Sequence, residues 1–139
     1  MSKDFEQISL KPGFMKYNGG VLFKTISQDE YHFKTTIKEN HLNAAGITHG
    51  GFIAAVVDAG AGTAAHRAAN QNPCVTVSLE LKFISAIKLG QELLGKTKIQ
   101  KKTKSMIFLT CELSAENKIV ATASGVWKIL KLSGAGPGG

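Results

Sequence analysis

The sequence is poor in cysteine and in acidic residues, and it has no long apolar run. Its two cysteines, Cys74 and Cys111, show no CxxC spacing, which argues against both a disulfide framework and a thiolate zinc cluster. No run approaches the ~20 apolar residues that span a bilayer, and the first residues lack the apolar core of a signal peptide. We therefore expect a soluble cytoplasmic protein.

Two catalytic classes are also disfavoured by what is missing. No G-x-S-x-G elbow occurs, because Ala123-Ser124-Gly125 lacks the first glycine, so a serine hydrolase is not expected. His49, Asp58 and His66 are spaced so that on one helix they would stand more than ~10 Å apart, which is too far for a shared zinc ion. We expect no metal and no cofactor.

The composition is that of a globular protein of about one domain. The 139 residues are 43% hydrophobic and 19% charged, which is too apolar for a disordered chain. Seventeen Lys and Arg against ten Asp and Glu give a net charge of +7, which indicates an anionic partner without identifying it. We expect a single domain over residues 1–132 and a flexible Gly-rich tail over residues 133–139.

Period-2 hydrophobic patterns predict about six strands. The clearest runs from Val75 to Phe83, where every odd position is apolar and every even one polar, as in a half-buried strand. Short polar joins at 27–30 and 115–118 predict antiparallel hairpins. The six segments are Val21–Ser27, Tyr31–Ile37, Val75–Phe83, Glu92–Gln100, Met106–Leu113 and Ile119–Leu130.

The period changes between the second and third of these segments. From Gly50 to about Asn70, apolar residues recur at helical spacing, at Phe52, Ile53, Val56, Val57 and Gly60. One long helix among antiparallel strands predicts an α+β fold in which the sheet wraps the helix. Gly60 and Gly62 each lower helix propensity by roughly 1 kcal/mol relative to Ala, so their small size must have another use.

Asp58 is the only charged residue between His49 and His66, and small residues surround it at helical spacing. These neighbours are Ala54, Ala55, Ala61, Gly62 and Ala65. Such a stripe would let a ligand or a second chain approach a partly desolvated carboxylate. The alternative is a solvent-facing Asp58 beside a stripe that only packs against another helix.

Gly50-Gly51 follows His49 at the expected start of this helix, where the first N–H groups have no intrahelical acceptor. Donors in that position can stabilise an oxyanion, although a plain turn into the helix would have the same sequence. His49 could orient this loop or contact the substrate. For His41 we expect a structural role.

The run H-x-N-x-x-G-x-x-H-G-G-x₆-D, from His41 to Asp58, with the alternating strand after it, resembles the hotdog-fold acyl-CoA thioesterases of the PaaI and acyl-CoA thioesterase 13 type. The resemblance covers residues 41–129. It implies a hotdog fold, in which a curved antiparallel sheet wraps one central helix. It also implies a dimer or a dimer of dimers, with active sites between protomers.

The resemblance assigns the site residues by position. It implies that Asp58 is the general base or nucleophile, assisted by Thr76, and that Asn43 positions the water or the thioester. It places the Gly50 N–H, with His49, at the thioester carbonyl. The implied substrate-binding residues, those at the coenzyme A included, are Gly51, Ser78, Phe83, Lys101, Lys102, Thr103, Lys104, Ser105, Met106 and Lys128.

So small a set is consistent with thioester hydrolysis, because a thiolate leaving group with a conjugate-acid pKa of about 8.5 needs little acid assistance, and a base with an oxyanion hole can suffice. The expected function is therefore hydrolysis of an acyl- or aryl-acyl-CoA. The alternative is a non-catalytic hotdog protein that binds acyl-CoA or another anionic ligand, and the lysines could also form only a solvated hairpin. Nucleic-acid binding is not expected, since aromatic platforms among the basic residues are too few. Membrane insertion is not expected either, since no apolar run is long enough.

Overall fold

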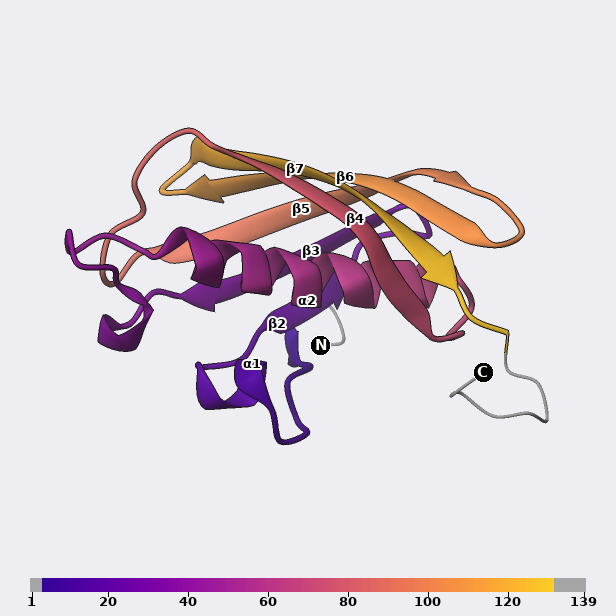
Figure 1. Cartoon of the computed structure of the whole chain (residues 1–139), viewed down its shortest axis with the longest axis horizontal. Coiled ribbons are helices and arrows are strands. Elements are labelled where there is room, and N and C mark those ends of the chain that lie inside the picture. The colour runs from indigo at the N-terminus through magenta and orange to yellow at the C-terminus, as the bar shows by residue number, and fades with distance from the viewer. Residues whose placement is uncertain (1–3, 132–139) are drawn as a thin grey trace.

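The computed structural model describes residues 4–131, and the tail expected at 133–139 lies outside them. One long helix, α2 (Gly50–Ala68), lies along a seven-stranded sheet that curves over it (Figure 1). The strands are β1 (Glu6–Gln7), β2 (Leu22–Thr25), β3 (Glu30–Thr36), β4 (Cys74–Phe83), β5 (Glu92–Lys102), β6 (Met106–Ala115) and β7 (Lys118–Ile129). In the described part of the chain, no helix is both long and apolar enough to cross a membrane.

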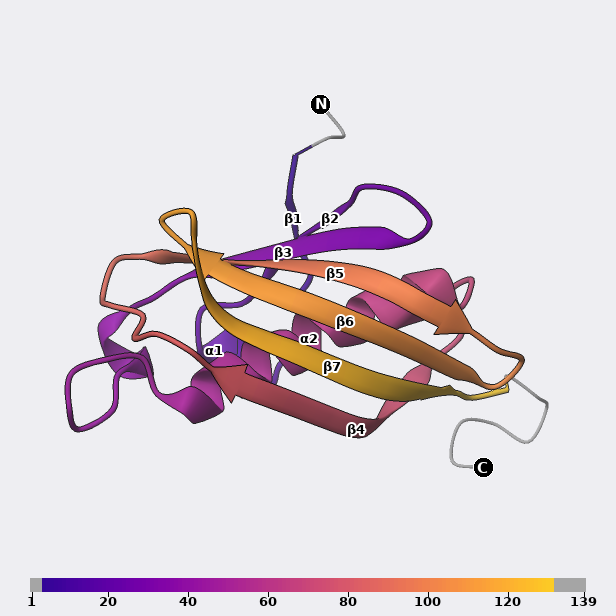
Figure 2. The same cartoon turned by 90° about the horizontal axis from the view of Figure 1, so that it is seen from above.

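The sheet is antiparallel throughout, with the strand order β1-β2-β3-β5-β6-β7-β4 (Figure 2). All six predicted strands are present, and both predicted hairpins, β2–β3 and β6–β7, are confirmed. The seventh strand, β1, pairs with β2. With only two residues, β1 is too short to leave a periodic pattern in the sequence. One helix wrapped by this sheet is the predicted hotdog architecture.

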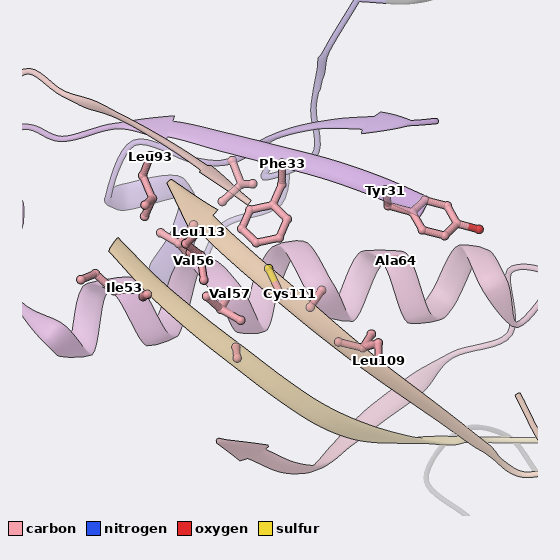
Figure 3. Packing of buried hydrophobic residues seen from close by; sticks show 14 of the residues in the cluster. Tyr31, Phe33, Ile53, Val56, Val57, Ala64, Leu93, Leu109, Cys111 and Leu113 are labelled. Carbon is pink, nitrogen blue, oxygen red and sulfur yellow. The ribbon is translucent and has the colours of Figure 1, made fainter. Parts of the chain in front are cut away.

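The core lies between α2 and the concave face of the sheet (Figure 3). The helical residues predicted to face inward are all buried, and they meet alternate residues of β3, β5, β6 and β7. Cys111 is among these sheet residues, and burial raises the pKa of its thiol to about 12. Apolar burial on both sides of this interface fixes the face that α2 presents to the sheet.

Two glycines make room for one aromatic ring at the centre of this core. A Cβ on Gly60 of α2 would lie 2.3 Å from Phe33, and a Cβ on Gly95 of β5 would lie 2.2 Å from the same ring. The ring of Phe33 therefore occupies the space that a side chain at either position would need. This contact explains the presence of Gly60 within a helix. The contact at Gly62 is looser, since a Cβ there would lie 3.3 Å from the indole nitrogen of Trp127.

Strand β4 differs from its prediction as a half-buried strand. Val75, Val77 and Phe83 are 45%, 55% and 57% exposed. β4 is the last strand of the sheet, and an irregularity between Thr76 and Ser78 interrupts the alternation of its side chains. The single chain therefore leaves an apolar edge strand uncovered.

Short helices precede α2, and the sequence patterns did not predict them. They are α1 (Phe14–Tyr17) and the 3₁₀ helix η1 (Glu39–His41). Two aromatic residues of α1, Phe14 and Tyr17, are 62% and 82% exposed, so they do not cover the sheet. His41 is buried, its Nε2 donates to the Asn18 carbonyl at 2.7 Å, and its ring stacks on Phe52, as a structural residue would.

Replacing Gly60 with Ala tests whether the Phe33 contact positions the helix. The added methyl group should lower the free energy of unfolding by about 1–3 kcal/mol through overpacking, although Ala favours a helix. Gly62→Ala is the matched control, because its methyl group requires a shift of only a few tenths of an ångström, and its change should stay below about 1 kcal/mol. Urea denaturation of both variants measures the difference, and equal stabilities would contradict this account.

Candidate active site

Asp58 lies on the side of α2 that faces β4, in contact with Thr76. The Thr76 hydroxyl donates a hydrogen bond to Asp58 Oδ1 at 2.7 Å, so the helix and the edge strand are joined at this point. The second oxygen, Oδ2, has no protein donor within residues 4–131. Asp58 is exposed in the single chain, so the expectation of a partly desolvated carboxylate is not met by one copy alone.

Only half of the small-residue stripe lies beside this carboxylate. Ala61 and Ala65 are fully buried in the core, because they fall on the inward face of α2. Ala54, Ala55 and Gly62 remain partly exposed. The absence of bulk around Asp58 therefore comes from these three residues.

A cavity of about 390 Å³, which we call the Asp58 pocket, opens between α2 and β4. Residues that the sequence analysis did not assign to the site line it together with Asp58 and Thr76. They are Ala59, Gly62, Thr63, His66, Pro73, Cys74 and Trp127. His66 follows Asp58 by about two helical turns, so its position on the same side of the helix could have been predicted from the sequence spacing. Trp127 reaches the pocket only because β7 pairs with β4 at Thr76, a register that no local pattern reveals.

A second cavity of about 300 Å³, the Gly50 pocket, lies at the amino end of α2. Asn43, Gly50 and Phe83 line it, and the Phe83 ring lies 3.5 Å from where a Cβ of Gly50 would be. Within residues 4–131 the backbone N–H of Gly50 has no acceptor. This pocket therefore holds an unpaired helix N-terminal donor beneath an aromatic ring.

The side chain of Asn43 divides its hydrogen bonds between the loop and the pocket. Its Oδ1 accepts from the backbone N–H groups of Ala45 at 2.9 Å and Ile47 at 3.3 Å, which shapes the turn before α2. The Nδ2 amide has no acceptor in the described part of the chain. Asn43 is therefore available as a donor and not as an acceptor.

His49 and Gly51 are paired with each other. His49 is the N-cap of α2, and its Nδ1 accepts from the Gly51 N–H at 2.8 Å. That bond uses the Gly51 donor, so of the two predicted N–H groups only that of Gly50 remains free. His49 itself is exposed beside the pocket.

The two pockets lie at different positions along one helix. Gly50 and Asp58 are separated by eight residues, which is about 12 Å at a rise of 1.5 Å per residue. A carboxylate and an N–H group that act on one carbonyl must both lie within hydrogen-bond reach of it. The single chain therefore separates the predicted base from the predicted oxyanion donor.

The predicted coenzyme A residues form one basic structure, the β5–β6 hairpin at residues 101–106. Thr103 Oγ1 accepts from the backbone N–H groups of Ser105 and Met106, which closes the turn. Met106 pairs with Lys128 of β7, and Lys128 pairs with Val75 of β4. The lysines of this hairpin, Lys101, Lys102 and Lys104, are exposed, as is Lys128. Figure 2 shows this hairpin at the end of the sheet where β4 begins.

Ser78, the remaining predicted binding residue, lies in β4 and lines neither pocket. It pairs with Val126 of β7 and is exposed. Among residues 4–131, no group of three His, Cys, Asp or Glu side chains is arranged to hold a metal ion. The chemical groups at the two pockets therefore include a carboxylate, an amide and backbone donors, together with the polar side chains of Thr63, His66, Cys74 and Trp127.

Comparison with known sequences agrees with this geometry. A family model described as the thioesterase superfamily matches residues 45–122. The protein named "Putative esterase PA0474" of Pseudomonas aeruginosa is 35% identical over 94 residues, which cover 67% of this chain and 70% of that protein. Acyl-coenzyme A thioesterase 13 of Mus musculus is 26% identical over 103 residues, with 74% of each chain covered.

A solved structure has the same fold. The crystal structure of zebrafish thioesterase superfamily member 2 superposes with a TM-score of 0.79, at 22% identity, over 88% of this chain and 90% of that one. At this identity the likeness establishes the hotdog fold alone.

The two thiols should differ in reactivity, because Cys74 is partly exposed at the Asp58 pocket whereas Cys111 is only 3% exposed. Burial raises the pKa of both thiols, that of Cys111 to about 12, while Lys102 opposes the rise at Cys74. Iodoacetamide should therefore label native Cys74 slowly, faster as the pH rises toward the pKa, and should leave Cys111 unlabelled. Mass spectrometry of the native, urea-unfolded and Cys74→Ser proteins checks this, and labelling of native Cys111 would contradict the described core.

Proposed function

The chain belongs to the thioesterase superfamily, and we propose that it is an acyl-CoA thioesterase, which hydrolyses an acyl- or aryl-acyl-CoA to a free acid and coenzyme A. One observation carries this proposal more than any other. A carboxylate, Asp58, is anchored through one oxygen by Thr76 and presents its other oxygen to a pocket. A protein that only bound an anionic ligand would gain nothing from a carboxylate at that position.

Asp58 acts on the thioester carbonyl carbon. Its free Oδ2 either removes a proton from an attacking water, as a general base, or attacks the carbon itself and forms an acyl anhydride, which water then hydrolyses to the free acid. Thr76 holds Oδ1 and so orients Oδ2 toward the pocket. Cleavage then releases coenzyme A as a thiolate, which needs little help from a general acid.

Gly50 and Asn43 supply the donors for the carbonyl oxygen. The Gly50 N–H stands at the positive end of α2, where negative charge is stabilised. The free Nδ2 of Asn43 lines the same pocket and donates to the carbonyl oxygen or to the water. His49 contributes by capping the helix, which fixes the direction of these N–H groups.

A complete site requires two copies of the chain, because Gly50 and Asp58 are about 12 Å apart on one rigid helix. The exposed edge strand β4 offers the surface for pairing. If β4 paired antiparallel with its own copy about a point between Leu79 and Glu80, Thr76 would lie opposite Phe83. Since Thr76 contacts Asp58 and Phe83 contacts Gly50, this pairing brings the base of one copy to the oxyanion donor of the other.

The basic hairpin then binds the nucleotide end of coenzyme A. Lys101, Lys102 and Lys104 are exposed at the end of the sheet nearest Thr76, and Lys128 lies beside them. Ammonium groups in this position can pair with phosphates. This assignment explains part of the excess of basic residues in the sequence.

Replacing Asp58 with Asn should lower kcat by about 10²–10⁴-fold, which is the usual contribution of a general base. The amide oxygen can still accept from Thr76, so the fold should be retained. Free-thiol release from short, long and aryl acyl-CoAs measures the loss, and urea denaturation measures stability. Full activity in Asp58→Asn would contradict the mechanism, and Glu116→Gln, in the exposed β6–β7 turn, is the matched control.

The lysine assignment predicts a KM that depends on salt. Raising the ionic strength shortens the Debye length from about 10 Å at 0.1 M to about 3 Å at 1 M, so KM should rise while kcat changes little. Lys101→Gln and Lys104→Gln should raise KM and reduce this salt dependence. Lys118→Gln, at the start of β7, should behave as the wild type. A KM that does not depend on salt would leave the hairpin without this role.

A further inference from the structure

A buried tryptophan presents an unpaired donor to the Asp58 pocket. Trp127 is 1% exposed and lines the pocket, and it is the only tryptophan in the sequence. Within residues 4–131 its indole N–H has no acceptor, and the protein does not enclose this nitrogen completely, so the N–H faces the pocket. A Cβ on Gly62, which lines the same pocket, would lie 3.3 Å from this nitrogen, so the absence of a side chain at Gly62 leaves the N–H accessible.

An unpaired acceptor lies one helical turn away. His66 Nδ1 lies 2.8 Å from the carbonyl oxygen of Asn72, so this nitrogen carries the proton and donates to that oxygen. In the neutral ring Nε2 is then an acceptor, and it has no partner in the described part of the chain. Gly62 and His66 are four residues apart, so they lie on the same side of α2. The same end of the pocket thus offers both a donor and an acceptor.

From these two groups we propose that the Asp58 pocket binds a hydroxyl or keto oxygen carried by the acyl group of the substrate. The inference rests on the proposed thioesterase function and specifies its substrate class. Gly62 is about 6 Å from Asp58 along the helix, so the oxygen would lie only a few atoms from the thioester. A plain alkyl chain would leave the indole N–H buried and unpaired, and a site of this kind discriminates strongly against such a chain.

Matched acyl-CoAs of four carbons test this preference. The quantity measured is the ratio of kcat/KM for acetoacetyl-CoA or 3-hydroxybutanoyl-CoA to kcat/KM for butanoyl-CoA. Trp127→Phe removes the N–H, and Gly62→Ala places a methyl group over it without removing the ring. Each variant should lower the ratio about tenfold relative to wild type, which is the value of one hydrogen bond to a group otherwise left unpaired. Dividing by the wild-type ratio cancels the different intrinsic reactivities of the thioesters.

Two variants are used so that the ratio can still be measured if one of them is unstable. Gly62→Ala adds a helix-favouring residue at a tolerant position, so a general loss of structure is not expected from it. A purely structural role for Trp127 would reduce turnover of all three substrates equally and leave the ratio unchanged. Ratios within about twofold of wild type in both variants would overturn the proposal.

Fluorescence separates this inference from the proposed function, because Trp127 is a single intrinsic probe. In Asp58→Asn protein, acetoacetyl-CoA should shift the tryptophan emission, while butanoyl-CoA should shift it much less. This binding signal needs no hydrolysis, so it appears even if the wild-type protein turns over none of the three thioesters. Identical emission with both ligands would overturn the oxygen preference, whatever the result for catalysis.

Discussion

The packing of Phe33 between Gly60 of α2 and Gly95 of β5 holds the central helix at one depth beneath the sheet. Because neither glycine carries a side chain, the helix approaches the sheet more closely than Ala would allow. Interiors are packed at crystal-like density, so such a contact fixes position as well as stability. With the helix at this depth, the Asp58–Thr76 hydrogen bond joins it to the edge strand.

The rigid helix also keeps the proposed base and the proposed oxyanion donor of one chain apart. Gly50 and Asp58 remain about 12 Å apart whatever the loops do, since an α-helix does not shorten by that amount. The edge strand β4 carries both the Thr76 contact to Asp58 and the Phe83 contact to Gly50. Pairing β4 with its own copy would bury exposed apolar side chains and at the same time bring together one half-site from each chain.

The fold was predictable from the sequence because its elements have strong periodicities. Apolar and polar residues alternate from Val75 to Phe83, and this pattern predicts the strand that the structure contains. The helical spacing after Gly50 likewise predicts the observed helix. The exposure of β4 was not predictable, because a strand shows the same alternation whether its apolar side chains face the core of its own chain or another molecule. For the candidate site, local spacing predicted Asp58, which lines the pocket. Trp127 joins the pocket through strand pairing across more than fifty residues, which local patterns do not encode.

Mixing two inactive variants tests the composite site most directly. Asp58→Asn removes the base, and Asn43→Asp keeps the loop acceptor but removes the amide donor. In a two-fold dimer that contains one chain of each kind, one of the two sites regains both wild-type residues, so random exchange of subunits should restore about a quarter of wild-type kcat. Activity in the mixture no higher than the average of the two variants alone would contradict a site shared between two chains.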